Sequence, residues 1–286
     1  MILCGVKGSE VALLVTDIIR IIVPTVFLKQ YGAQRTGTNY LRILLQKNRP
    51  GACMLMHILG DKHSPPAPFD ALWAAAQLTP DPPLAFVSSA TFQHPSRTTS
   101  PANPRQREEV RRIAEPLTAA YLDQSLGFVI TIKNPYAWAV SIARYEGRIG
   151  RNATLDPRLA GFVRDRCASF NQRYRSWFQL AAHTSWRTLV VRHEDLIRDP
   201  GQVLAGLDVK FGLRAESPFI DEPRVAPTTC WDNQDDPANE VPFDRSYYLE
   251  ERYLARLSPE AMEAVTVTID WELLRGLEYE PPPPSS

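Results

Sequence analysis

The chain has 286 residues, of which 44% are hydrophobic and 22% are charged, and this composition excludes an intrinsically disordered protein. Its 32 Lys and Arg residues balance 32 Asp and Glu residues, so the formal net charge is zero. Proteins that bind duplex nucleic acids normally carry a basic surplus, and we therefore expect no nucleic-acid partner. An anionic ligand would have to be held by local charges and by backbone dipoles.

The N-terminal region contains an apolar run, residues 11–28, which is interrupted by Asp17, Arg20 and Pro24. A charged residue at the centre of a membrane helix costs about 2.5–3.5 kcal/mol, so we expect no membrane span. Neither a cationic start nor a cleavage site is clear, which argues against a signal peptide. We expect a buried helix at residues 10–22 and a cytoplasmic protein, with membrane association through this segment as the alternative.

Strand and helix patterns then alternate along the chain. The predicted strands and helices follow in chain order: a strand at 25–31, a helix at 38–47, a strand at 52–59, a helix at 69–78, a strand at 84–88, a helix at 106–123, a strand at 127–132, helices at 135–143 and 155–182, a strand at 186–191, and helices at 200–211, 247–257 and 259–274. This alternation is typical of an α/β fold with a central, mostly parallel sheet.

We expect a single domain over residues 1–286, with its core at 25–212, a proline-rich insertion at 64–104 and a disordered tail at 280–286. Four cysteines are scattered without a C-x-x-C pair, and their spacing favours neither a particular disulfide nor a zinc site. We therefore expect reduced thiols and no bound metal ion.

The segment Gly-Ala-Gln-Arg-Thr-Gly at residues 32–37 joins a predicted strand to a predicted helix. Such a turn directs successive backbone N–H groups and the positive end of the helix at one point, which suits a phosphate or a sulfate. The nucleotide triphosphate version of this loop continues with Lys and then Ser or Thr. Here Thr38 and Asn39 stand at those positions, and the positive charge lies inside the loop, at Arg35.

Three segments together resemble the sulfotransferase family. Residues 34–40, Gln-Arg-Thr-Gly-Thr-Asn-Tyr, resemble its 5′-phosphosulfate loop. Residues 128–141 resemble its 3′-phosphate motif, although Lys133 stands where Arg is usual. Residues 189–200 are similar to a strand that ends in Tyr-Glu-Asp-Leu, with His193 in place of Tyr, and Asn39 replaces a hydroxyl residue of the first motif.

The resemblance implies a three-layer α/β sandwich and the sulfuryl donor 3′-phosphoadenosine 5′-phosphosulfate, used without a metal ion. It implies that Arg35 stabilises the negative charge that grows on the leaving phosphate oxygen. It also implies that Tyr40 stacks on the adenine, although Tyr40 could equally be a core residue. The expected donor-binding residues are Arg35, Thr36, Gly37, Thr38, Asn39, Tyr40, Lys133, Ser141 and His193.

A hydroxyl acceptor must lose a proton, so a general base is expected within hydrogen-bond reach. In the resembled family this base follows the strand after the phosphosulfate helix, and the matching region here is residues 57–63. His63 is the first choice, ahead of Asp61 and His57. The acceptor would be a carbohydrate, a lipid or a small molecule, and the insertion at 64–104 is expected on its side.

Two other functions stay open at this point, a P-loop kinase for a small molecule and a nucleotide-binding protein without catalysis. A carboxylate pair, Glu194 and Asp195, follows the last predicted strand, and we interpret it as a structural turn and helix cap.

Overall fold

The computed structural model describes residues 26–55, 61–66, 116–117, 119–120, 123–150, 152–215, 217–221 and 243–281. Several expectations lie outside these residues: the N-terminal helix at 10–22, the helix at 69–78, the strand at 84–88, and His57. Most of the insertion at 64–104 and of the tail at 280–286 lies outside them as well.

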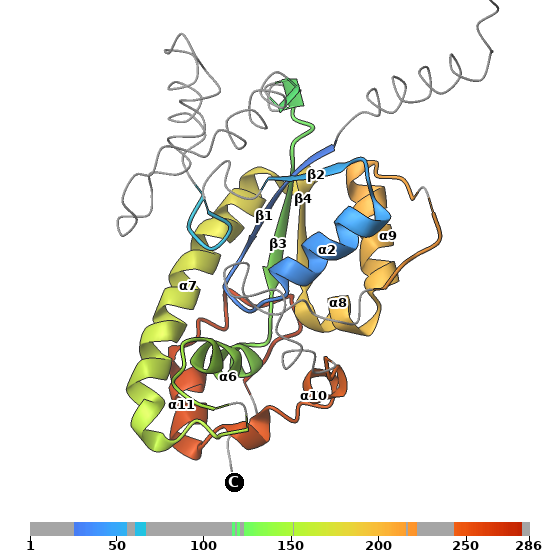
Figure 1. Cartoon of the computed structure of the whole chain (residues 1–286). Coiled ribbons are helices and arrows are strands. Elements are labelled where there is room, and N and C mark those ends of the chain that lie inside the picture. Colours follow the sequence, from blue (N-terminus) through green and yellow to red (C-terminus); the bar gives the residue numbers. More distant parts are fainter. Residues whose placement is uncertain are drawn as a thin grey trace, which may run out of the picture.

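Four described strands form one sheet in the order β2-β1-β3-β4, and all of them are parallel (Figure 1). They are β1 (Val26–Gly32), β2 (Ala52–Leu55), β3 (Gly127–Ile132) and β4 (Thr188–Arg192). All six residues of β3 are buried, as expected for a strand that is covered on both faces. The predicted α/β class and parallel sheet are therefore confirmed.

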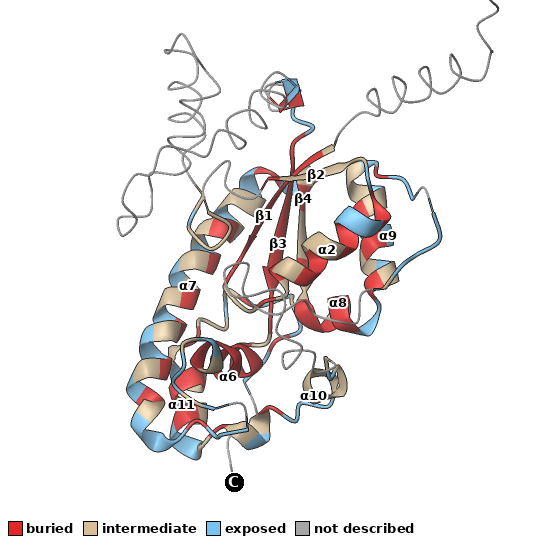
Figure 2. Cartoon of the chain, viewed as in Figure 1, coloured by how far each residue is buried: buried red, intermediate tan, exposed pale blue. Residues whose placement is uncertain are grey.

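Helices cover both faces of this sheet. On one face, helices α2 (Thr38–Asn48), α8 (His193–Arg198) and α9 (Pro200–Phe211) pack on Leu28 and Val129. On the other face, α7 (Ala160–His183) shares a hydrophobic cluster with Phe27 and Phe128, and α6 (Pro135–Tyr145) and α11 (Pro259–Thr268) pack against α7. Figure 2 shows buried residues along the strands and on the helix sides that face them.

Helix starts follow local chemistry. Asn134, Asp199 and Ser258 each accept a hydrogen bond from a first-turn N–H group, and each is followed by a proline. Proline has no N–H group to leave unpaired at this position, and its fixed φ suits a first turn. At the end of α9, Gly212 adopts φ 68°, the left-handed conformation that ends helices.

Near the C-terminus the structure differs from the predicted helices at 247–257 and 259–274. The first is two short pieces, α10 (Ser246–Leu249) and a 3₁₀ turn (Leu254–Arg256), because Glu251 between them adopts φ 53°. The second ends at Thr268, since Ile269 is extended with ψ 135°.

Two other boundaries move. The predicted helix at 155–182 begins at Ala160, because Leu155 forms a bridge with Leu257. The strand predicted at 186–191 begins at Thr188, since Ser185–Arg187 forms a 3₁₀ turn. None of the described helices combines the length and the apolar character needed to cross a membrane. Cys167 is a buried free thiol.

Candidate functional site

The loop at residues 33–37 leaves the carboxyl end of β1 and leads directly into α2. Arg35 and Gly37 both have positive φ, at 71° and 87°. Left-handed residues within a turn draw successive N–H groups together into a concave surface that suits an anion. α2 begins directly after Gly37, and no side chain caps it. The positive end of the α2 dipole therefore faces the loop without a capping group.

Close packing beneath the loop requires two glycines. A Cβ atom on Gly32 would lie 2.1 Å from Thr131 Oγ1, and one on Gly37 would lie 3.0 Å from His193 Cδ2. The Thr36 hydroxyl is buried in the same place, where it donates to Ala33 O at 2.7 Å and lies 3.1 Å from Thr131 Oγ1. This hydroxyl therefore holds the loop together.

Side chains of α6 and α7 fix the loop from the opposite side. The Tyr174 hydroxyl donates to Thr131 O at 2.7 Å and accepts a bond from Ala33 N at 3.3 Å. Trp138 Nε1 donates to Gln34 O at 2.9 Å. The loop conformation is thus set by the core before any ligand binds.

Arg35 is half-buried, and its guanidinium lies over the ring of Tyr145, 5.6 Å from the centroid. Burial lowers the pKa of Arg35, and the nearby Tyr248 and Tyr145 partly oppose this shift. A guanidinium starts from a pKa above about 12 and stays charged. Its Nε has no hydrogen-bond partner among the described residues. A buried donor of this kind is suited to an anionic ligand.

Lys133 and Ser141 lie eight positions apart in the sequence, and the fold brings them into contact. Lys133 follows β3 and is 1% exposed, and its Nζ donates to Ser141 Oγ at 3.0 Å. The Ser141 hydroxyl in turn donates to Ala137 O at 2.8 Å. Burial lowers the pKa of Lys133, while Tyr248 and Glu194 act in the opposite direction.

Glu194 holds this junction in place. It is 8% exposed, and its Oε1 accepts a 3.0 Å hydrogen bond from Asn134 N. Its Oε2 accepts a hydrogen bond from the hydroxyl of Tyr279. Asp195 forms surface ion pairs with Arg192 and Arg198. Both carboxylates therefore have structural partners.

His193 is the first residue of α8 and lies beside the loop. Burial lowers the pKa of His193 well below its ordinary value, and the positive charges of Lys133 and Arg35 add to the effect. The imidazole is therefore neutral near pH 7. Its Nδ1 has no hydrogen-bond partner among the described residues.

Two predicted donor-binding residues make other contacts. Tyr40 is 6% exposed in the core, and its hydroxyl donates to Asp221 Oδ1 at 2.7 Å and accepts from Arg245 at 3.1 Å. Asn39 accepts a 2.6 Å hydrogen bond from Lys62 Nζ. Thr38 is buried at the first position of α2. The core interpretation of Tyr40 agrees with its packing, and its contact with an adenine stays a prediction.

His63 and Asp61 lie together beside Gly32, the last residue of β1. His63 Nδ1 lies 2.7 Å from Gly32 O, and His63 N donates to Asp61 Oδ1 at 2.7 Å. Because a carbonyl oxygen only accepts, Nδ1 carries the ring proton and Nε2 keeps its lone pair. Burial lowers the pKa of His63 to about 4; the Gly32 hydrogen bond opposes the shift and the charge of Lys62 adds to it.

The structure places Tyr248 beside Lys133 and His193, a position that sequence reasoning missed. Lys133 Nζ lies 3.8 Å from the centroid of the Tyr248 ring, and the His193 ring packs edge-on at 5.0 Å. Burial alone would raise the pKa of Tyr248, but Lys133, Ser141 and Arg35 together lower it. Nothing in the spacing of Tyr248 from the three motifs could have indicated this contact.

These groups gather at one edge of the sheet. The Arg35 loop, Lys133 and His193 follow β1, β3 and β4, whose carboxyl ends meet there. β1 has β2 on one side and β3 on the other, so the chain changes direction across the sheet between β1 and β3. Open α/β sheets bind their ligands at such a point.

Among solved structures, the chain is similar to the sulfotransferase domain of the Synechococcus PCC 7002 olefin synthase, with 17% identity and a TM-score of 0.39 over 85% of this chain and 93% of that one. It is also similar to the sulfotransferase domain from the curacin biosynthetic pathway, with 11% identity and a TM-score of 0.40 over 91% of this chain and 99% of that one. No protein-family model and no curated protein matches the sequence.

Proposed function

We propose that this chain is a sulfotransferase, which moves a sulfuryl group from 3′-phosphoadenosine 5′-phosphosulfate to a hydroxyl group of a carbohydrate, a lipid or a small molecule. The observation that carries the proposal is the contact between Lys133 Nζ and Ser141 Oγ at 3.0 Å, next to the Arg35 loop. It provides a cation and a hydroxyl for one anionic group, while the loop provides a second anion site. A nucleotide with phosphates at both the 3′ and 5′ positions suits such a pair of sites.

Three features of the chain fit this donor. Arg35 Nε and His193 Nδ1 are buried polar atoms without partners among the described residues. Arg35 and Gly37 hold the loop in the left-handed conformation that exposes N–H groups. A side chain at Gly37 would press on His193 and close the concave surface.

In the proposed reaction the donor supplies an activated sulfuryl group, whose transfer has a loose transition state like that of phosphoryl transfer. The protein therefore contributes mainly position and charge. Arg35 stabilises the charge on the leaving oxygen, and Lys133 with Ser141 orients the nucleotide through its 3′-phosphate. Thr36, Gly37, Thr38 and Asn39 shape the 5′ site, and no metal ion takes part.

His63 is the proposed general base. The bond from Nδ1–H to Gly32 O fixes the ring and leaves Nε2 free to accept the acceptor's proton. A pKa of about 4 keeps the ring neutral at pH 7 but makes it a weak base. A weak base suits a loose transition state, in which the hydroxyl needs little deprotonation. Asp61 supports His63 through its backbone, and Asp61 and His57 are the alternatives as base.

Calorimetry with nucleotides tests the donor assignment. Adenosine 3′,5′-bisphosphate should bind equally well with EDTA and with Mg²⁺, whereas ATP should bind weakly in both conditions. Tighter, Mg²⁺-dependent binding of ATP would indicate a kinase instead. If the bisphosphate binds but no acceptor in a screen with labelled donor becomes sulfated, the chain is a binding protein without catalysis.

A further inference from the structure

The ring of Tyr248 lies against both residues that are assigned to the 3′-phosphate. Lys133 Nζ is 3.8 Å from the ring centroid, and Lys133 and Ser141 both lower the pKa of the phenol. His193 packs edge-on against the ring, and Phe243 stacks on it with centroids 5.5 Å apart. Tyr248 therefore fills the space between groups that would otherwise face an anion.

The contact of Lys133 with the Tyr248 ring replaces part of the attraction that an anion would provide. Lys133 is only 1% exposed, and within the described part of the chain no carboxylate forms an ion pair with it. The π face of an aromatic ring and an oxygen lone pair both attract a cation. Tyr248 presents its π face to Lys133, and in this way it offsets some of the cost of burying the charge. A phosphate dianion would offset more of that cost, because its full charge attracts the ammonium more strongly.

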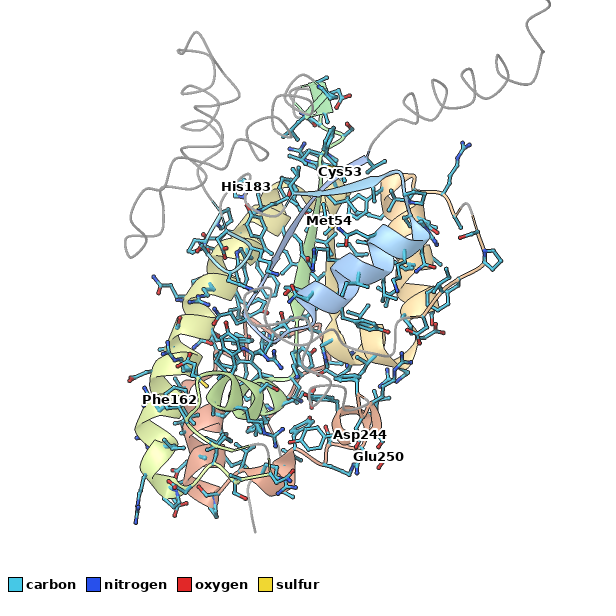
Figure 3. The ribbon with its side chains drawn as sticks, in the orientation of Figure 1. Cys53, Met54, Phe162, His183, Asp244 and Glu250 are labelled. Atoms are coloured by element: carbon cyan, nitrogen blue, oxygen red, sulfur yellow. The ribbon has the colours of Figure 1, made fainter. Side chains whose placement is uncertain are left out.

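The helix that carries Tyr248 is short, and an ion pair on the protein surface lies at its start. α10 spans only Ser246–Leu249, and Asp244 at its start pairs with Arg252 at 2.6 Å, where both side chains are about half exposed. Figure 3 shows Asp244 and Glu250 on the side of α10 away from the sheet. Exposed ion pairs contribute little to stability, so this pair alone does little to hold the helix in place.

We propose that Tyr248 occupies the 3′-phosphate site of the ligand-free chain and that the phosphate displaces its phenol when the donor binds. The inference rests on the proposed function, because it takes Lys133 and Ser141 as the 3′-phosphate site. Only chains in which Tyr248 has left the site bind the phosphate. The measured affinity for a 3′-phosphorylated nucleotide is therefore reduced by the fraction of chains in which Tyr248 occupies the site. A nucleotide without a 3′-phosphate escapes this reduction.

The test compares Tyr248→Phe with the matched control Tyr247→Phe by calorimetry. Tyr247 is the adjacent residue of α10, and its hydroxyl accepts from Arg144 at 3.1 Å. Tyr248→Phe removes the phenol oxygen, so adenosine 3′,5′-bisphosphate should bind about tenfold more tightly. Tyr248→Ala removes the ring as well and should tighten binding at least as much. Adenosine 5′-monophosphate should bind all variants within about twofold, and Tyr247→Phe should match the wild type.

The outcomes separate this inference from the proposed function. Unchanged or weaker bisphosphate binding by both Tyr248 variants, with melting temperatures like that of the wild type, would overturn the displacement while leaving the donor assignment intact. Bisphosphate binding by the Tyr248 variants but not by the wild type would support the displacement. No bisphosphate binding by any form would overturn both. As a second measurement, the tyrosine absorbance near 290 nm should change when the bisphosphate binds to the wild type, and this change should be lost in Tyr248→Phe.

Discussion

Lys133 combines almost complete burial with a positive charge, and its surroundings compensate that charge only in part. Replacement by Met keeps the length of the side chain and removes the charge. Because a buried charge without an ion pair costs free energy, Lys133→Met should leave the stability of the fold unchanged or raise it. It should weaken adenosine 3′,5′-bisphosphate about ten- to a hundredfold, since a charge-assisted hydrogen bond contributes about 1.5–3 kcal/mol.

Adenosine 5′-phosphosulfate, which lacks the 3′-phosphate, is the control ligand for Lys133→Met. Its affinity should stay the same when both nucleotides are titrated by calorimetry. An equal loss for both would mean that Lys133 supports the fold and does not contact the phosphate.

Arg35 is expected to act in the transition state. Arg35→Ala should lower kcat by about 10²–10³, the effect of removing one group that stabilises a developing oxyanion. Arg35→Lys should restore part of the rate, because it keeps the charge but not the planar fork. Initial rates with an acceptor from the labelled-donor screen measure both. The control is Arg198→Ala, which removes only a surface pair with Asp195; full activity in Arg35→Ala would contradict the role.

The lowered pKa of His63 predicts how stability depends on pH. The ring titrates near 6.5 in the unfolded chain and at about 4 in the folded one, so below pH 6.5 the unfolded state binds more protons. The wild type should therefore lose stability as the pH falls from about 6.5 to 4, by up to about 3 kcal/mol. In His63→Gln this loss of stability at low pH should be smaller than in the wild type.

Urea unfolding at pH 5 and pH 7 measures this difference. His183→Gln is the control, because it makes the same change at an exposed position at the end of α7. In activity assays the acid limb should lie near pH 4, well below the ordinary range of histidine. An acid limb that persists unchanged in His63→Gln would pass the role of base to Asp61 or His57.

At the scale of elements, the loop at residues 33–37 depends on the backbone of Gly37. An alanine there would have to adopt φ 87° and would place its Cβ 3.0 Å from His193. Gly37→Ala should therefore destabilise the fold by about 1–2 kcal/mol and weaken bisphosphate binding. Gly206→Ala is the matched control: Gly206 lies inside α9 with no atom within 4 Å of the added Cβ, so the change should stabilise by about 0.5–1 kcal/mol. Unfolding in urea compares the two, and equal effects would exclude a special conformation at Gly37.

Elements with strong local signals could be predicted from the sequence. A proline behind a capping side chain marked the starts of α6 and α9, and the continuous apolar run marked β3 residue for residue. Elements near the C-terminus could not be placed as well. Glu251, which follows α10, adopts a left-handed conformation for which glutamate has no preference, so nothing in the sequence marks this break.

The same contrast holds for the site. The contact between Lys133 and Ser141 is encoded locally, because a strand end, a proline-started helix and two helical turns fix their distance. Tyr248 reaches Lys133 only through the fold, from more than a hundred residues further along the chain. No spacing rule connects the two, and only the structure could reveal the contact.

At the scale of the whole molecule, Glu194 ties the C-terminal segment to the sheet edge. Tyr279 is 5% exposed, and its hydroxyl donates to Glu194, whose other oxygen holds Asn134. Tyr279→Phe would leave a buried carboxylate oxygen without its donor and should cost about 1–3 kcal/mol in urea unfolding. Tyr145→Phe, at a residue that is 46% exposed, should change stability by less than about 0.5 kcal/mol. Equal effects of the two would mean that the C-terminal segment is not anchored through Glu194.

The parallel sheet also has a consequence for how the chain assembles. Parallel neighbours require crossover connections, and residues 28–32 pair with residues 127–131. A nascent chain thus exposes the Arg35 loop long before Lys133 is synthesised. A nucleotide held at both ends would act as a noncovalent cross-link between these distant segments, and it would stabilise the finished fold in proportion to the logarithm of its concentration. Supply of the donor in the cell would then set how long each molecule survives, as well as how fast it works.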